Sequence, residues 1–460
     1  MNNALLIIPA PQGLSNFDLA LLLGYAFVCL AIGFYSGLKQ TKTDYLIGSR
    51  KLGMIGFVFS VVASYIGGAA LVAYSAYVYK FGVSALAVFV GTALGFVVFI
   101  PYARKIRKMS GTQEFLTLSD YFYFLYGKRA GLVSAILLFV VYMGMLLNQF
   151  IAGSSILSNI SGWSYESSLL FSSSIISIYL FAGGFRSVIK TDIFQYVVLF
   201  VILLIIAYLA FSQQMMATTQ LVDLSAMDPA MSIAFLAFGV LIIFQSSEYW
   251  QRVYAAKNNN IVRNGFIWSA VLVVVTGFAI TMVGLIAHHK LPGIDSRDAF
   301  ASGLRLVMPQ KFLGAGLVLI FAAIMSSADT IIFVLASSMA KDYFKRLSKS
   351  DKTDADLMKI TRIFTLVFSL AGFVLALLFR DLVQVIVFIT GLGFTIIPAA
   401  IASFHVKLKP KAVYYSFLAG ALYIVVLVCF GLLIPEYSIA SVLIAALSLL
   451  VAQKLLPAAQ

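Results

Sequence analysis

A row of oxygen-bearing side chains interrupts the long apolar stretch of residues 312–340. Four of them lie within five positions: Ser326, Ser327, Asp329 and Thr330. On a helix, three of these side chains share one face with Ala323, because they recur at i, i+3, i+4 and i+7. Hydroxyl and carboxylate oxygens suit a small hard cation. The serines could instead bond to their own helix or join two helices. Asp329 makes that reading less favourable, because an isolated carboxylate is costly in an apolar span.

The composition indicates an integral membrane protein. Of the 460 residues, 62% are hydrophobic and 11% are charged, whereas soluble domains have about 25% charged residues. The net charge of +14 comes from short loops between apolar runs, which argues against nucleic-acid binding. Cys29 and Cys429 both lie in apolar runs, so a disulfide is not expected. The sequence has no phosphate-binding loop, no Cys/His metal spacing and no nucleophile elbow, so we do not expect an enzyme.

Thirteen apolar segments are long enough to be considered as membrane spans. They cover residues 17–37, 53–79, 83–105, 130–158, 165–184, 188–212, 230–254, 264–287, 312–340, 358–380, 383–405, 412–434 and 437–455. With thirteen spans, 26 Lys and Arg residues fall on one side and 6 on the other. The positive-inside rule then places the N-terminus outside the cell membrane and the C-terminus in the cytoplasm. We expect the densest basic cluster, Lys341–Arg362, to be a solvated cytoplasmic connection.

The second apolar span has small residues at its centre. Gly67 and Gly68 precede Ala69 and Ala70, and Tyr65 adds a polar group. Small residues favour close helix packing in lipid. They are also found where transporter helices break at mid-membrane. We favour a break, with Tyr65, Gly67, Gly68 and Ala70 lining a substrate site.

The seventh span is also interrupted. Gln245 and Ser246 lie at a depth where they could line a cavity, whereas Glu248 and Arg252 are spaced to pair at i, i+4 near the interface. Two interrupted helices five spans apart predict inverted repeats with a site between them. The predicted units are residues 1–52, an extra helix and loop; 53–212, the first repeat; 230–405, the second; and 406–460, two extra helices.

Two further polar groups have competing explanations. Asn148 and Gln149 lie in the middle of the fourth span, where they either line a cavity or bond across helices. Asp192 follows Lys190 by two positions. A surface pair between these two would place Asp192 at the interface.

Several motifs together resemble the sodium:solute symporter family, the group of the sodium/proline and sodium/glucose cotransporters. The motifs are DYLIGSRKLG at 44–53, GGFRSVIKTDIFQ at 183–195, WQRVYAAK at 250–257, AAIMSSADT at 322–330 and AKDYFKR at 340–346. Their order along nearly the whole chain matches the family. The resemblance implies an all-α membrane fold of the leucine-transporter type, with a 5+5 inverted repeat and about thirteen transmembrane helices.

The resemblance also implies ion sites. The main sodium site would comprise Ala63, Ile66, Ala323, Ser326 and Ser327. Some family members have a second ion site, which here would comprise Asp192, Ser326, Asp329 and Thr330. Asp329 could strengthen sodium binding there or carry a proton.

We therefore expect sodium-coupled symport of a small polar organic solute. An amino acid or monocarboxylate is favoured and a sugar comes next, with Tyr65, Gly67, Gly68, Ala70, Asn148, Gln149, Gln245 and Ser246 as candidate substrate residues. The expected partners are the sodium ion, the solute and the bilayer, with no nucleic acid and no obligate protein partner. The alternatives are proton coupling on the same fold and a transporter-like sensor. A sensor is less favoured because the chain ends at Gln460, soon after the last span.

Overall fold

The computed structural model describes residues 14–38, 40–213, 215, 223–224, 226–346, 353–380 and 382–457. Three lysines of the predicted basic clusters, Lys39, Lys349 and Lys352, lie outside the described residues. The described α-helices are α1 (Asn16–Leu38), α2 (Lys42–Ile47), α3 (Met54–Tyr65), α4 (Gly68–Phe81), α5 (Ala87–Gln113), α6 (Leu118–Ser161), α7 (Tyr165–Ser212), α8 (Pro229–Gln245), α9 (Ser247–Ala255), α10 (Asn259–Lys290), α11 (Ala299–Val307), α12 (Leu313–Ser338), α13 (Asp354–Leu378), α14 (Leu382–Phe394), α15 (Ile397–Ala402), α16 (Pro410–Cys429), α17 (Pro435–Ile439) and α18 (Ser441–Leu455). Short 3₁₀ turns cover Gly48–Arg50, Gly82–Leu86, Ser296–Asp298 and Gln310–Phe312, and a π-helix covers Met339–Lys345.

The structure does not confirm the count of thirteen spans. Within the described residues, ten helices are long and apolar enough to cross a membrane, or eleven if the bent pair α8 and α9 is one span. One reason is that two predicted spans fall in the 48-residue α7, which is interrupted at Gly184. Gly184 has φ +56°, and a Cβ there would lie 2.5 Å from the ring of Tyr45. Only glycine meets both conditions without strain.

Helix α12, which contains the polar row, lies at the centre of the bundle. Every residue from Gly316 to Ser337 is buried. The helix packs against α1, α3, α6, α7 and α13. Its serines, threonine and aspartate are therefore shielded from lipid, as expected for polar groups in a membrane span.

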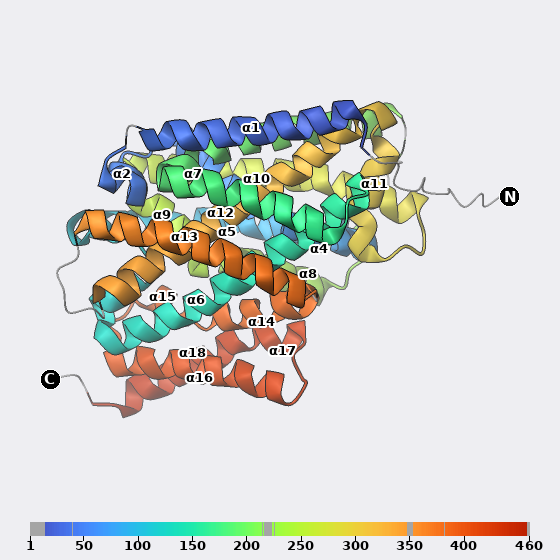
Figure 1. Cartoon of the computed structure of the whole chain (residues 1–460). Helices are drawn as coiled ribbons and strands as arrows, with labels where there is room; N and C mark the ends of the chain where they lie inside the picture. Colours follow the sequence, from blue (N-terminus) through green and yellow to red (C-terminus); the bar gives the residue numbers. More distant parts are fainter. Residues whose placement is uncertain are drawn as a thin grey trace.

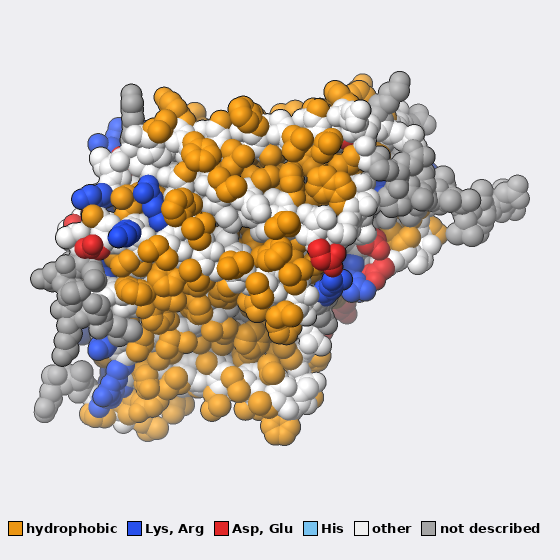
Figure 2. Space-filling model, viewed as in Figure 1, with side chains coloured by type: hydrophobic (Ala, Val, Ile, Leu, Met, Phe, Trp, Pro, Cys, Tyr) orange, Lys and Arg blue, Asp and Glu red, His pale blue; other side chains and the backbone are white. Residues whose placement is uncertain are grey.

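The face of the molecule that Figure 2 shows is apolar across its middle. Figure 2 shows broad hydrophobic areas between two ends that carry charged side chains. Lys and Arg gather at the end that holds α2 in Figure 1, which we call the basic end. The other end holds α11, and we call it the α11 end. Exposed aliphatic side chains such as Leu443, Leu447 and Leu450 on α18 suit contact with lipid tails.

Candidate ion and substrate site

The second predicted span is broken at its centre. Helix α3 ends at Tyr65 and α4 begins at Gly68. Between them Gly67 is extended, with φ −95° and ψ 172°. A Cβ on Gly67 would lie 2.5 Å from Ser327 Oγ and 2.5 Å from Gln149 Nε2, so only a glycine lets these three segments meet. The break leaves the last carbonyls of α3 without the next helical turn to bond.

Two serines of α12 face this break. Ser326 Oγ lies 3.1 Å from the carbonyl oxygen of Ala63 and 3.2 Å from that of Ala323. Ser327 Oγ lies 3.5 Å from Ala63 O and 3.2 Å from Ser64 O. The structure thus brings together four of the five predicted main-site residues, and the fifth, Ile66, lies at the break itself.

The oxygens around the break fit a sodium ion by their chemistry. They are neutral carbonyl and hydroxyl oxygens on buried or half-buried residues, without nitrogen or sulfur. Hard cations without a strong geometric preference take such ligands. The site also joins the end of one helix to the middle of another, so its geometry depends on how α3 and α12 are placed.

The residues predicted for a second ion have several different partners. Asp192 is fully buried and forms an ion pair with Arg252, with 3.2 Å between Oδ2 and Nη2. The same Nη2 donates to Thr330 Oγ1 at 2.8 Å. Two predictions are therefore wrong. Asp192 pairs with Arg252 and not with Lys190, and Arg252 does not pair with the carboxylate of Glu248.

Asp329 has different neighbours from Asp192. Its Oδ2 accepts hydrogen bonds from Tyr179 OH at 2.7 Å and Thr191 Oγ1 at 3.2 Å, both on α7. Its Oδ1 is buried without a hydrogen-bond partner among the described residues. Thr191 is the sequence neighbour of Asp192, so α7 supplies a partner to Asp329 and also carries the carboxylate that pairs with Arg252. Tyr179 is not among the predicted site residues, because no local sequence pattern marks it as a partner of Asp329.

The seventh predicted span is bent at its polar segment. Helices α8 and α9 meet at Ser246 with a 53° bend. The Glu248 carboxylate accepts a hydrogen bond from Tyr142 OH on α6. Gln245 Oε1 is buried without a hydrogen-bond partner among the described residues. A Cβ on Gly393 would clash with that oxygen, so Gln245 faces α14.

The amides of the fourth predicted span lie beside the first break. Gln149 Oε1 accepts a hydrogen bond from the backbone N–H of Ala69 at 3.2 Å, in the first turn of α4. The neighbouring Asn148 is buried, and its Oδ1 has no partner within the described residues. Tyr65 accepts a hydrogen bond from Thr92 on α5 at 2.7 Å. Polar groups from α3, α4, α5 and α6 thus converge at the break.

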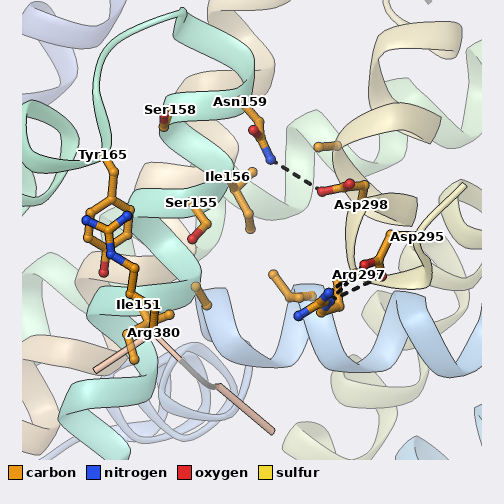
Figure 3. A pocket seen from close by; sticks show the side chains of 13 residues that line it. Ile151, Ser155, Ile156, Ser158, Asn159, Tyr165, Asp295, Arg297, Asp298 and Arg380 are labelled. Atoms are coloured by element: carbon orange, nitrogen blue, oxygen red, sulfur yellow. Dashed lines mark hydrogen bonds and ion pairs between the residues drawn. The ribbon is translucent and has the colours of Figure 1, made fainter. Parts of the chain in front are cut away.

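A cavity of about 370 Å³ opens on the α11 end of this region. It begins two residues beyond Gln149 on α6 and reaches the loop that contains Arg297 (Figure 3). Its lining residues are Val72, Ile151, Ala152, Ser155, Ile156, Ser158, Asn159, Tyr165, Asp295, Arg297, Asp298, Ala301 and Arg380. None of the predicted substrate residues is among these lining residues.

Charged groups at the mouth of the cavity are paired. Arg297 Nη2 donates to Asp295 Oδ2 at 2.6 Å, and these bonds lower the pKa of the Asp295 carboxyl to about 2. Burial and the nearby charge of Asp295 raise the pKa of Asp298. Arg380 lies over the ring of Tyr165, with 4.6 Å to its centroid. The cavity is thus lined at this end by paired charges and an aromatic ring.

The basic end is closed by contacts between distant segments. Leu52, before α3, forms a short parallel β-bridge with Ala256, after α9. Arg107 Nε donates to Ala256 O at 2.6 Å. These contacts hold the ends of both interrupted spans together.

Ion pairs reinforce that closure. Lys341 Nζ lies 2.9 Å from Asp120 Oδ2, and Arg346 contacts both Asp120 and Asp342. Both carboxylates are buried. The prediction of a solvated connection is therefore wrong for the first residues of Lys341–Arg362, and residues 347–352 lie outside the described residues.

Comparison with known proteins identifies the family. The model of the sodium:solute symporter family matches residues 45–409. The chain belongs to this family. It is therefore a multi-pass membrane symporter and not an enzyme, and the resemblance read from its motifs is confirmed.

Curated relatives share 24% identity with the chain over most of its length. The osmoregulated proline transporter OpuE of Bacillus subtilis aligns over 388 residues, which are 79% of this chain and 78% of that one. The sodium/pantothenate symporter of Haemophilus influenzae covers 75% of both chains, and the sodium/proline symporter of Staphylococcus aureus covers 76% of this chain and 73% of its own. The family and the last two of these relatives are named for sodium-coupled transport, which implies that this chain uses sodium.

A solved structure confirms the fold. A Na⁺-coupled sialic acid symporter in a substrate-bound outward-open state superposes with a TM-score of 0.83 at 18% identity, over 97% of this chain and 99% of that one. The all-helical fold is thus the leucine-transporter type with a 5+5 inverted repeat.

Proposed function

We propose that this symporter couples sodium entry at the break between α3 and α4 to uptake of a small amino acid or monocarboxylate. The observation that carries the proposal is the position of Ser326 and Ser327, which face the carbonyls of Ala63 and Ser64. The proposed sodium ligands are the carbonyls of Ala63, Ile66 and Ala323 with the hydroxyls of Ser326 and Ser327.

The proposed substrate site adjoins the sodium site. The first turn of α4 presents backbone N–H groups at a helix N-terminus, where a carboxylate is favoured. Gln149 already accepts from one of these groups, and it can exchange that bond for one to the solute. Tyr65 would add an aromatic wall. Asn148, Gln245 and Ser246 are proposed as further lining groups, reached as the helices move.

The chemistry of the relatives supports a carboxylate substrate. Proline transporters and a pantothenate symporter are among the curated relatives, and both solutes carry one carboxylate. The cavity of about 370 Å³ is within the usual range for small-molecule sites, about 300–1,000 Å³. A sugar is the second candidate, since polar amides also suit hydroxyl groups.

The proposed mechanism is alternating access. We assign the α11 end to the outside and the basic end to the cytoplasm, in line with the distribution of Lys and Arg. The open cavity at the α11 end and the contacts that close the basic end support an outward-facing state. The proposed repeats, residues 53–212 and 230–405, would rock against each other around the two breaks.

Sodium coupling supplies enough energy for accumulation. One sodium ion that moves down a potential of about 100 mV provides about 2.3 kcal/mol. At one ion per solute, this sustains about a fiftyfold gradient before any sodium gradient is counted.

Uptake by purified protein in liposomes tests the proposal. We expect saturable uptake of radiolabelled proline, pantothenate or a similar monocarboxylate when sodium is outside, and loss of uptake when choline replaces sodium. A thermal-shift screen of solutes with and without sodium would select the substrates to try. Uptake driven by a pH gradient and indifferent to sodium would refute sodium coupling, and binding without uptake would favour a sensor.

A further inference from the structure

We propose that the guanidinium group of Arg252 is a tethered cation at the position predicted for a second ion, so that the transporter binds sodium at one site only. The proposal rests on the sodium coupling proposed above and specifies its stoichiometry. In this proposal Arg252 determines how many sodium ions the protein binds, and it does not contact the solute.

Arg252 fills a pocket of oxygen atoms. Its Nη2 lies 3.2 Å from Asp192 Oδ2, 2.8 Å from Thr330 Oγ1 and 3.2 Å from Ser64 Oγ. Its Nε donates to Ser60 Oγ at 2.9 Å. These four partners come from α3, α7 and α12, and the arginine itself comes from α9. Three helices thus supply the oxygens and a fourth supplies the cation.

The burial of this group explains why it excludes an ion. The side chains of Arg252 and Asp192 are 1% and 0% exposed. A buried carboxylate requires a positive partner, and Arg252 provides one that cannot dissociate. A sodium ion bound to Asp192 as well would lie a few ångströms from the guanidinium, where like charges repel strongly because little water screens them.

Most oxygens of the other predicted ligands of a second ion already have partners. Thr330 Oγ1 accepts from Arg252. Ser326 Oγ is directed to the carbonyls of Ala63 and Ala323, within the proposed main site. The Oδ2 atom of Asp329 accepts from α7. Asp192 Oδ1 and Asp329 Oδ1 have no hydrogen-bond partner among the described residues, whereas the other oxygens are divided between Arg252, the proposed main site and α7.

Arg252 is also connected to the proposed main site. Ser64 accepts from Arg252 through its hydroxyl, and its carbonyl accepts from Ser327 Oγ at 3.2 Å. Arg252 thus braces the last turn of α3, which presents the carbonyl of Ala63. We infer that the tethered cation positions the sodium ligands as well as replacing a second ion.

Equilibrium binding of ²²Na⁺ to purified wild-type protein in detergent tests this directly, without relying on transport. We expect one sodium ion per protein. Arg252→Gln frees the Asp192 carboxylate, so we expect a second bound sodium ion and a steeper binding curve. Arg252→Lys retains a cation and should bind one. The double variant Asp192→Asn/Arg252→Gln has lost both charges, so it should also bind one sodium ion. Because it leaves no unpaired buried charge, it should remain folded even if Arg252→Gln does not.

The outcomes separate this proposal from the one on which it rests. Two sodium ions on the wild type, with one lost in the double variant, would overturn the role of Arg252 while retaining sodium coupling. A single ion on a folded Arg252→Gln protein would also overturn it. Absence of sodium binding to the wild type would overturn sodium coupling itself. Size-exclusion profiles and melting temperatures identify the folded variants.

Discussion

Replacing Ser327 with alanine removes one proposed sodium ligand and little else. Ser327 Oγ is directed to the carbonyls of Ala63 and Ser64, at 3.5 and 3.2 Å, and its loss leaves the helix backbone unchanged. A hydrogen bond or similar polar contact to a charged group is worth about 1.5–3 kcal/mol. The sodium concentration for half-maximal uptake should therefore rise about 10- to 150-fold.

The assay is solute uptake by liposomes at increasing external sodium, with sodium-dependent thermal stabilisation as a second readout. Ser369→Ala is the matched control, because Ser369 is also buried but its hydroxyl donates to Thr365 O within α13, at 2.8 Å. We expect the control to keep the wild-type sodium dependence. If Ser327→Ala showed the same half-saturation as Ser369→Ala, the proposed sodium site would be refuted.

Three further predictions concern the break and the closed end. Gly67→Ala should abolish uptake, because the added Cβ atom would lie 2.5 Å from Gln149 Nε2. Gly24→Ala is the control and should transport normally, because a Cβ atom added there has no neighbour within 4 Å in the described part of the chain. Gln149→Ala should raise the half-saturating solute concentration by up to about tenfold, through loss of one polar contact; an unchanged value in uptake assays would exclude Gln149 from the substrate site. Asp120→Asn should weaken the pairing with Arg346 and raise hydrogen–deuterium exchange at the start of α6; unchanged exchange would show that this pair does not hold the basic end closed.

The membrane character and the polar row of α12 could be predicted from the sequence. Apolar length and charge content decide whether a segment enters a bilayer, and both are local properties. The break at Gly67 was also predictable, because small residues at mid-span permit it. The number of separate helices was not, since α7 continues through Gly184 with only a local interruption.

The pairing of the buried charges could not be predicted. Spacing along the chain suggested Glu248 for Arg252 and Lys190 for Asp192, because only neighbours on one element are visible in a sequence. In the folded protein Arg252 reaches Asp192 instead. The cost of burying a charge selects whichever partner the packing brings into contact.

The sequence by itself determined that polar oxygens would lie inside an apolar helix and that another helix would be weak at its centre. Composition and helical periodicity require only local information. The tertiary structure alone decided that Ser326 and Ser327 face the carbonyls of Ala63 and Ser64 while Asp329 turns to Tyr179. These contacts depend on how α3, α7 and α12 pack, because the packing of the helices decides which neighbouring helix each side chain of α12 contacts.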